Sequence, residues 1–179
     1  MDIFTGPEAM NEKQRILYIE DNPEHLELLQ RYLEMKLGVI VDLAASAGGA
    51  EMLLNARCYD LVISDVNLPI VFGTEIVEQI LKRDPGQPVM LLSEHTEGKA
   101  KEEAERIGVP LQRKFSSFAS GDFDQFLTYV RTLLSQRPCA FNTNADAEKA
   151  ERMLLPPIRL VSENVQCARA AYRFRHAHA

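Results

Sequence analysis

The chain has 179 residues, 46% of them hydrophobic and 26% charged, and a formal net charge of -6. This length predicts one globular domain with an appendage, and the acidic balance disfavours nonspecific binding to nucleic acid, which depends on a basic face. No apolar stretch approaches the length of a membrane span, residues 1–13 lack the pattern of a signal peptide, and three widely spaced cysteines argue against a disulfide framework or a zinc site. These features predict a cytoplasmic protein.

The first half of the predicted fold alternates short apolar runs with amphipathic segments. Residues 15–19 form an apolar run that predicts a buried strand. Asn22 and a following proline indicate a helix start, and leucines at helical spacing continue until Gly38 ends that helix. The β-branched run 39–41 predicts a second strand, and residues 47–56 predict a second helix.

The second half repeats this alternation. Three further strands and three further helices are predicted, in chain order, as strand 60–64, helix 74–82, strand 88–92, helix 97–106, strand 109–113 and helix 122–134. Five strands that alternate with five helices indicate an α/β fold, doubly wound, with a parallel five-stranded sheet covered on both faces.

Polar side chains stand where four of these strands end. Glu20 and Asp21 follow the first strand, Asp65 the third, Ser93 the fourth and Lys114 the fifth. Each has a plain structural interpretation, as a turn residue, as acids near a helix N-terminus or as a solvated lysine. In a parallel sheet, however, the carboxyl ends of the strands share one edge, and open α/β sheets keep their chemistry there. The coincidence of all four therefore favours a functional site.

The carboxylates of this group predict a metal site. Clustered carboxylates repel one another unless a cation is present, and a site made of oxygen ligands suits Mg²⁺. We expect Asp21 and Asp65 to bind the ion directly, Glu20 to bind it through water, and the backbone carbonyl of Asn67 to be a neutral ligand.

Phosphoryl chemistry is consistent with the same residues. With its charge offset by a metal, a carboxylate such as Asp65 can act as a nucleophile toward phosphorus and form an acyl phosphate. Phosphoryl transfer requires mainly positioning and neutralisation of the phosphoryl oxygens. Lys114 would supply a cation for this purpose, and Ser93 a hydroxyl.

Four motifs, ILYIEDNP, DLVISDVNLPIVFG, VMLLSEHT and QRKF, resemble the receiver domain of bacterial two-component response regulators, over about residues 14–135. The resemblance implies a (βα)5 flavodoxin-like fold with strand order 2-1-3-4-5. It implies Mg²⁺-dependent transfer of a phosphoryl group to Asp65 from a phosphohistidine of a sensor histidine kinase or histidine phosphotransfer protein. Ser93 and Lys114 would then be drawn onto the new phosphate. The face of the fourth helix, fifth strand and fifth helix would shift toward binding a downstream protein or a second copy of the chain. Such a domain is a signalling phosphoacceptor rather than an enzyme.

Three positions depart from the family pattern. Glu94 follows the hydroxyl residue, where the family usually has a small side chain that lets the phosphodonor approach. Leu111 stands three residues before the lysine, where an aromatic switch residue is usual, and Phe115 follows the lysine in place of proline. The phosphoacceptor therefore matches the family, while the residues that report its state do not.

The termini divide the chain further. We expect a flexible leader over residues 1–13, the receiver domain over 14–135, a linker over 136–150 and a basic, helical extension over 151–179, which holds five arginines against two glutamates. The extension is too short for a DNA-binding output domain, so no direct DNA binding is expected. It could dock on a partner or on the acidic receiver, or remain a disordered extension.

Two alternatives to a phosphoacceptor remain open. The chain could be a binding module of receiver fold that acts independently of phosphorylation, as its unusual residues suggest. It could instead be a metal-dependent phosphatase with an aspartyl nucleophile, but such enzymes usually carry a second aspartate two residues later, where this chain has Asn67.

Overall fold

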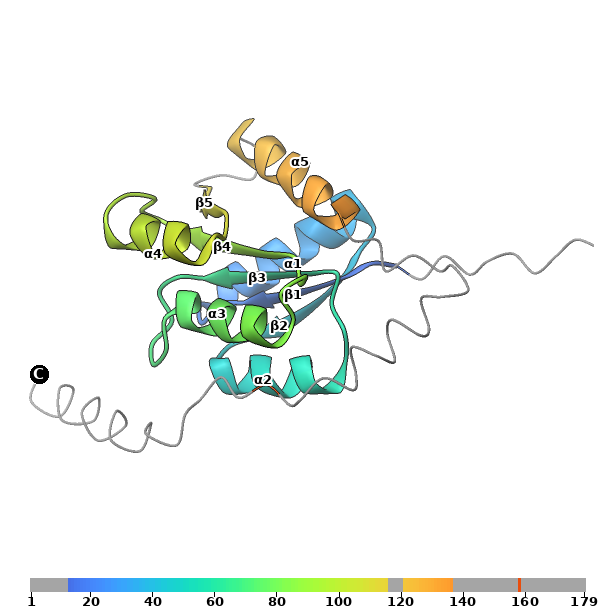
Figure 1. Ribbon diagram of the computed structural model, residues 1–179. Coiled ribbons are helices and arrows are strands. Elements are labelled where there is room, and N and C mark those ends of the chain that lie inside the picture. The colour runs from blue at the N-terminus through green and yellow to red at the C-terminus, as the bar shows by residue number, and fades with distance from the viewer. Residues whose placement is uncertain (1–12, 116–120, 137–157, 159–179) are drawn as a thin grey trace, which may run out of the picture.

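The computed structural model describes residues 13–115, residues 121–136 and Ile158. The strands are β1 (Arg15–Ile19), β2 (Ile40–Ala44), β3 (Leu61–Asp65), β4 (Val89–Ser93) and β5 (Leu111–Arg113). The helices are α1 (Pro23–Leu37), α2 (Ala47–Ala56), α3 (Gly73–Arg83), α4 (Lys99–Ile107) and α5 (Gly121–Gln136). The strands pair in parallel in the order β2-β1-β3-β4-β5 (Figure 1), which confirms the predicted fold and strand order.

Helices cover both faces of the sheet (Figure 1). Alternate residues of each strand point to opposite faces, so β1 sends Leu17 and Ile19 into a core shared with α2 and α3, and Ile16 and Tyr18 into a core shared with α1 and α5. Every residue of β3 and β4 is buried, as expected for central strands of a parallel sheet. Asp65 therefore lies at the end of a fully buried central strand.

Local signals set the first helix as expected. The side chain of Asn22 accepts hydrogen bonds from the backbone N–H groups of Glu24 and His25, which satisfies two of the unpaired donors of the first turn. Gly38 ends α1 with a φ of 68°, a left-handed conformation that glycine adopts without strain. Because α1 begins just after Asn22, Glu20 and Asp21 lie in the short connection between β1 and α1.

β3 and β4 begin and end one residue later than predicted, and β2 and β5 differ from the prediction by more than one residue. The second strand covers Ile40–Ala44 rather than 39–41, because the polar Asp42 is satisfied within the strand by Arg15 and by the Tyr59 hydroxyl. The fifth strand covers only Leu111–Arg113 rather than 109–113. There, the backbone N–H of Val109 bonds back to the end of α4.

The predicted linker, the proposed terminal helix and most of the leader lie outside the described residues, apart from Lys13, Gln136 and Ile158. Among the helices of the described part, none combines the length and the apolar character required to cross a membrane.

Candidate functional site

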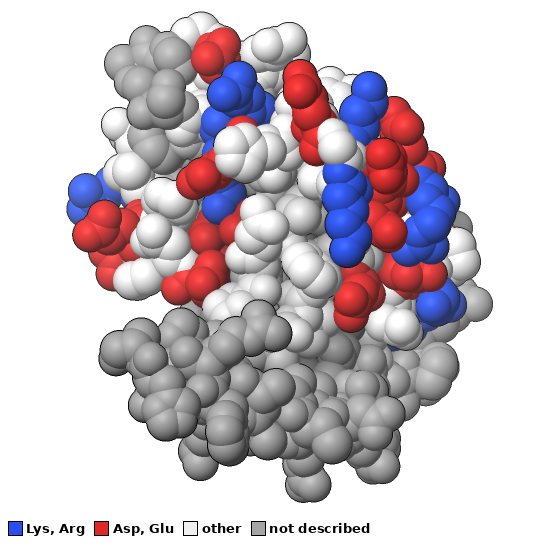
Figure 2. Space-filling view, turned by 90° about the vertical axis from the view of Figure 1, so that its left-hand side faces the viewer, with Lys and Arg blue, Asp and Glu red and all other residues white. Residues whose placement is uncertain are grey.

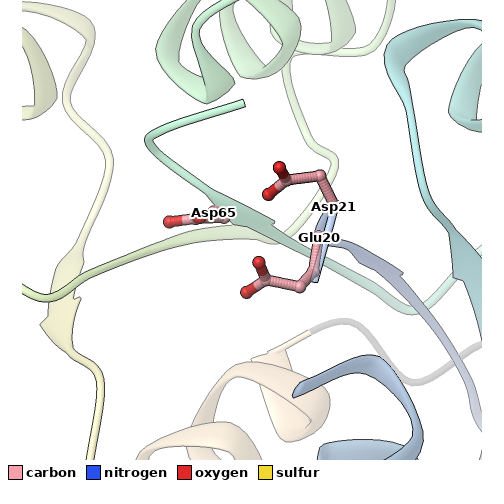
Figure 3. A group of neighbouring side chains, drawn as sticks. All are labelled: Glu20, Asp21 and Asp65. Carbon is pink, nitrogen blue, oxygen red and sulfur yellow. The ribbon is translucent and has the colours of Figure 1, made fainter. Parts of the chain in front are cut away.

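The ends of β1 and β3 bring three carboxylates together. Ile19 pairs with Ser64, so the next residues, Glu20 and Asp65, lie side by side at the carboxyl edge of the sheet. One carboxylate oxygen from each of Glu20, Asp21 and Asp65 lies within 4.8 Å of the others, and Figure 3 shows the three groups turned toward a common space. Glu20 and Asp65 are buried, whereas Asp21 is exposed. The structure therefore places the predicted acidic residues in one cluster.

Lys114 joins this cluster directly. Its Nζ lies 2.8 Å from Glu20 Oε2 and 2.9 Å from Asp65 Oδ2, and its side chain is only 16% exposed. The backbone N–H of Lys114 donates to the carbonyl of Ser93, which fixes the residue at the end of β4. The ammonium group thus bridges the two buried carboxylates and offsets part of their charge.

Burial and this bridge set the proton affinities at the site. Burial raises the pKa of Asp65, and the Lys114 ammonium only partly opposes that rise. Burial also acts to raise the pKa of Glu20, but hydrogen bonds from Lys114 and Tyr18 outweigh it and hold that pKa below its usual range. The carboxylate of Asp65 is therefore the less stabilised of the two buried groups, and a further cation beside it would favour its charged form.

Tyr18 is a member of the site that sequence reasoning missed. Its hydroxyl donates a 2.9 Å hydrogen bond to Glu20 Oε2, and the whole side chain is buried against α1 and α5. The available signal was its position two residues before Glu20, since residues i and i+2 of a strand face the same side of the sheet. Tyr18 helps to orient Glu20, whose Oε2 accepts hydrogen bonds from both the Tyr18 hydroxyl and the Lys114 ammonium.

Replacing Tyr18 by phenylalanine removes this donor and leaves a buried carboxylate oxygen with one donor fewer. We expect the free energy of unfolding to fall by about 1.5 to 3 kcal/mol, the range for hydrogen bonds to charged groups. Urea denaturation measures this loss. Tyr129→Phe is the matched control, because the Tyr129 ring packs on the same core and its loss of a hydroxyl should cost less than about 0.5 kcal/mol. Equal losses for the two variants would contradict the role given to Tyr18.

The loop after Asp65 returns closely to the strand. Gly73 begins α3, and its backbone N–H donates to the carbonyl of Val66. A Cβ at this position would lie 1.8 Å from the Asp65 carbonyl oxygen and 2.8 Å from Ser64 Oγ. Only glycine allows this approach, so Gly73 lets the loop that follows Asp65 pack against the end of β3.

The fourth strand places Ser93 beside the site. Ser93 is buried at the end of β4, and its Oγ accepts a hydrogen bond from the backbone N–H of His95. Glu94 between them is exposed. Asn67, two residues after Asp65, is exposed in the loop that leads to α3. The predicted hydroxyl and loop residues therefore lie at the same edge as the carboxylates.

The position after Lys114 has an aromatic packing role. The ring of Phe115 lies 4.9 Å from that of Phe123 and 5.2 Å from that of Phe126, centroid to centroid, which anchors the end of the β5 segment against α5. No peptide bond in the described residues is cis. Leu111, at the start of β5, is half-buried against the opposite core.

The donor set fits a hard divalent cation. Asp65 Oδ1 is a buried oxygen for which the described residues supply no hydrogen-bond donor, while Oδ2 is held by Lys114. A buried polar atom without a partner is costly, and a bound cation would satisfy it. Three carboxylates around one space are the oxygen ligands that Mg²⁺ prefers.

On the side of the molecule seen in Figure 2, acidic and basic side chains are interleaved rather than separated.

Comparisons with known proteins agree with the geometry. The family model of the response regulator receiver domain matches residues 16–110, more than half of the chain. The sensor protein EvgS of Escherichia coli O157:H7 is 31% identical over 105 residues, which cover 59% of this chain and 9% of EvgS. The transcriptional regulatory protein TctD of Salmonella typhimurium is 35% identical over 79 residues, which cover 44% of this chain and 35% of TctD. The chain thus matches about a third or less of the length of these relatives.

Solved structures show the same fold. The non-phosphorylated HemR receiver domain from Leptospira biflexa superposes with a TM-score of 0.60 at 27% identity, covering 70% of this chain and 98% of that one. The response regulator TrrA from Thermotoga maritima, solved in complex with Mg²⁺-BeF, gives a TM-score of 0.57 at 27% identity, covering 67% of this chain and 98% of that one.

Proposed function

This chain belongs to the response regulator receiver domain family of two-component systems, and from that premise we propose that it accepts a phosphoryl group on Asp65 with Mg²⁺ bound. The observation that carries the proposal is the state of the Asp65 carboxylate. Its Oδ1 is buried without a donor among the described residues, its Oδ2 is held by Lys114, and two further carboxylates stand beside it. This arrangement prepares Asp65 to receive a cation and an electrophilic phosphorus together.

Each residue has a separate part in the proposed reaction. Glu20, Asp21, Asp65 and the backbone carbonyl of Asn67 would hold the ion, which supplies positive charge to offset the carboxylates and the incoming phosphoryl oxygens. A carboxylate oxygen of Asp65 forms the bond to phosphorus while the bond from phosphorus to the donor imidazole breaks. The electron pair of the broken bond stays on the imidazole nitrogen.

Lys114 and Ser93 would bind phosphoryl oxygens during the transfer and after it. Lys114 already contacts an oxygen of Asp65, so its ammonium is within reach of a phosphoryl oxygen on that carboxylate. Ser93 would add a hydroxyl hydrogen bond. The phosphoryl group adds a charge of about -1.5 to -2, which would draw these two residues toward it. This movement would favour a second conformation of the segments that carry them. The face made by α4, β5 and α5 would report this change to a downstream protein.

A labelling experiment tests the proposal. The full chain is incubated with acetyl phosphate or with a phosphorylated histidine kinase, with Mg²⁺ or with a chelator, and the acid-precipitable label is measured. We expect label on the wild-type chain only with Mg²⁺, and none on Asp65→Ala. Absence of label on the wild type with every donor, or equal label on Asp65→Ala, would overturn the proposal.

Glu94 gives a further prediction for the rate of this reaction. The side chain is exposed and directly follows Ser93 in the chain, so its charge would repel an anionic phosphodonor that approaches this edge of the sheet. Removal of one like charge in water is worth up to about 1 kcal/mol, so Glu94→Ala should accelerate phosphorylation by acetyl phosphate up to about fivefold, and less at high salt. Initial rates at two ionic strengths measure the effect. Glu97→Ala removes an exposed charge further along the loop, and the hypothesis fails if both variants react at the same rate.

A second candidate function rests on Leu111 and Phe115. Phe115 is held by two aromatic contacts and Leu111 replaces the usual aromatic switch, so the same surface could bind a partner without phosphorylation. A tenfold or larger change in partner affinity on phosphorylation, about 1.4 kcal/mol, would rule this function out. A phosphatase is disfavoured by Asn67, and turnover of small phosphate esters should be undetectable.

The phosphodonor would be a sensor histidine kinase or a histidine phosphotransfer protein, and the output would be contact with another protein in the cytoplasm rather than with DNA or a membrane. The α4-β5-α5 face would also serve a homodimer. We propose that the chain divides into a leader over residues 1–13, a receiver domain over 14–135, a linker over 136–150 and an extension over 151–179.

A further inference from the structure

A residue far along the chain completes the core. Ile158 is only 4% exposed and belongs to the hydrophobic cluster that α2 and α3 form with the sheet. It lies 22 positions beyond Gln136, the last residue of α5. A single aliphatic side chain from a distant segment therefore occupies a position inside the domain.

Its backbone is held as specifically as its side chain. The Asn55 amide nitrogen donates to the Ile158 carbonyl at 3.0 Å, and the Ile158 backbone N–H donates to Asn55 Oδ1 at 2.8 Å. One side-chain amide thus pairs with both backbone groups of one residue, as a neighbouring β-strand would. This pair of bonds recognises an extended peptide backbone.

The surroundings form a defined pocket between the ends of two helices. The space left beside Ile158 is about 30 Å³, bounded by apolar and basic side chains that include Leu54, Ile80 and Arg83. The Arg83 guanidinium closes one side by donating from Nη1 to the Leu54 carbonyl, and its Nε is buried without a hydrogen-bond partner in the part of the chain that the structure describes. The pocket suits an uncharged aliphatic side chain, because burying a second cation next to Arg83 is costly.

The pocket lies at the opposite edge of the sheet from Asp65. Its lining includes Tyr59 and Gln87, which precede β3 and β4, whereas Asp65 ends β3. Occupation of the pocket therefore leaves the phosphoacceptor edge open.

We propose that the α2–α3 pocket is a peptide-docking site whose occupant is this chain's own segment at Ile158. The Ile158 side chain occupies the pocket, the Asn55 side chain hydrogen-bonds to the Ile158 backbone, and the segment is thereby anchored on the receiver domain.

Amide exchange of the full chain tests the anchor at the atoms that form it. We expect the Ile158 amide to exchange slowly in the wild type and at least tenfold faster in Asn55→Ala. Asparagine is a poorer helix former than alanine, so this substitution should not weaken α2 itself. Leu33 in α1 packs in the opposite core, and its amide should keep the same exchange rate in both chains.

Substitutions at the anchor residue give the matched comparison. Ile158→Val keeps a β-branched side chain and should retain protection at residue 158, whereas Ile158→Lys should lose it. Protection that is equal in wild type and Asn55→Ala, or an unprotected Ile158 amide in the wild type, overturns the proposal. Protection that falls on tenfold dilution would assign the occupant to a second copy and overturn the intramolecular anchor.

Discussion

Gly73→Ala should lower the free energy of unfolding by about 3 kcal/mol or more and abolish acceptance of a phosphoryl group. The added Cβ would meet the Asp65 carbonyl oxygen at 1.8 Å and Ser64 Oγ at 2.8 Å, and the first of these contacts is with backbone that is buried in the sheet. Overpacking of this kind is costly because the surrounding structure must move. Urea denaturation and the labelling reaction on the same preparation measure both effects.

Gly48→Ala is the control for this substitution. A Cβ at Gly48 has nothing within 4 Å, and the residue lies in α2, so alanine should stabilise the chain by about 0.5 to 1 kcal/mol. Wild-type stability of Gly73→Ala would contradict the close approach. Normal labelling of a destabilised Gly73→Ala would separate the glycine from the geometry of Asp65.

Lys114→Met should have the second large effect. The substitution keeps a long side chain but leaves Glu20 and Asp65, both buried, without the cation that bridges them at 2.8 and 2.9 Å. Breaking a buried ion pair by removal of one partner costs about 3 to 5 kcal/mol, and we expect the lower end of that range because Lys114 is 16% exposed. The rate of phosphorylation should fall about a hundredfold, as it does when a charge-stabilising donor is removed from an active site.

Magnesium and a surface lysine provide the controls for Lys114→Met. Saturating Mg²⁺ should recover part of the lost stability, because a ligand that binds only the folded state stabilises it and would offset the same carboxylates. Lys82→Met removes an exposed lysine that pairs with Glu78 and should cost less than about 1 kcal/mol. If the two lysine variants were equally stable and equally reactive, Lys114 would have no special part in the site.

The features that sequence predicted best depend on local patterns. Buried parallel strands are continuous apolar runs, so the run before Asp65 and its polar end could be recognised, and parallel pairing followed from the alternation with helices. The order of the strands followed from the resemblance to the receiver domain. The convergence of Glu20, Asp21 and Asp65 followed in turn, because strand ends share an edge. The boundary of β2 was wrong because Asp42 interrupts the apolar pattern but is paired inside the strand.

The features that sequence did not predict depend on contacts between distant segments. The position of Tyr18 two residues before Glu20 puts both side chains on one side of the sheet, but a tyrosine in an apolar strand is usually a core residue, so its hydrogen bond to Glu20 was not predicted. The close return of Gly73 to Asp65 depends on the path of the loop, and the contact of Ile158 with Asn55 joins residues 103 positions apart. Such contacts are set by tertiary packing, which a sequence pattern does not encode at single positions.

Site-resolved mass spectrometry of the phosphorylated chain is the most direct test of the central claim. The full chain is treated with a phosphodonor and Mg²⁺, the acyl phosphate is trapped by borohydride reduction, and the peptides are mapped. The account predicts that the reduced residue is Asp65, that it is absent when Mg²⁺ is chelated, and that neither Glu20 nor Asp21 is modified. Modification at one of those other carboxylates, or an unmodified Asp65 under conditions in which the chain carries phosphate, would contradict it.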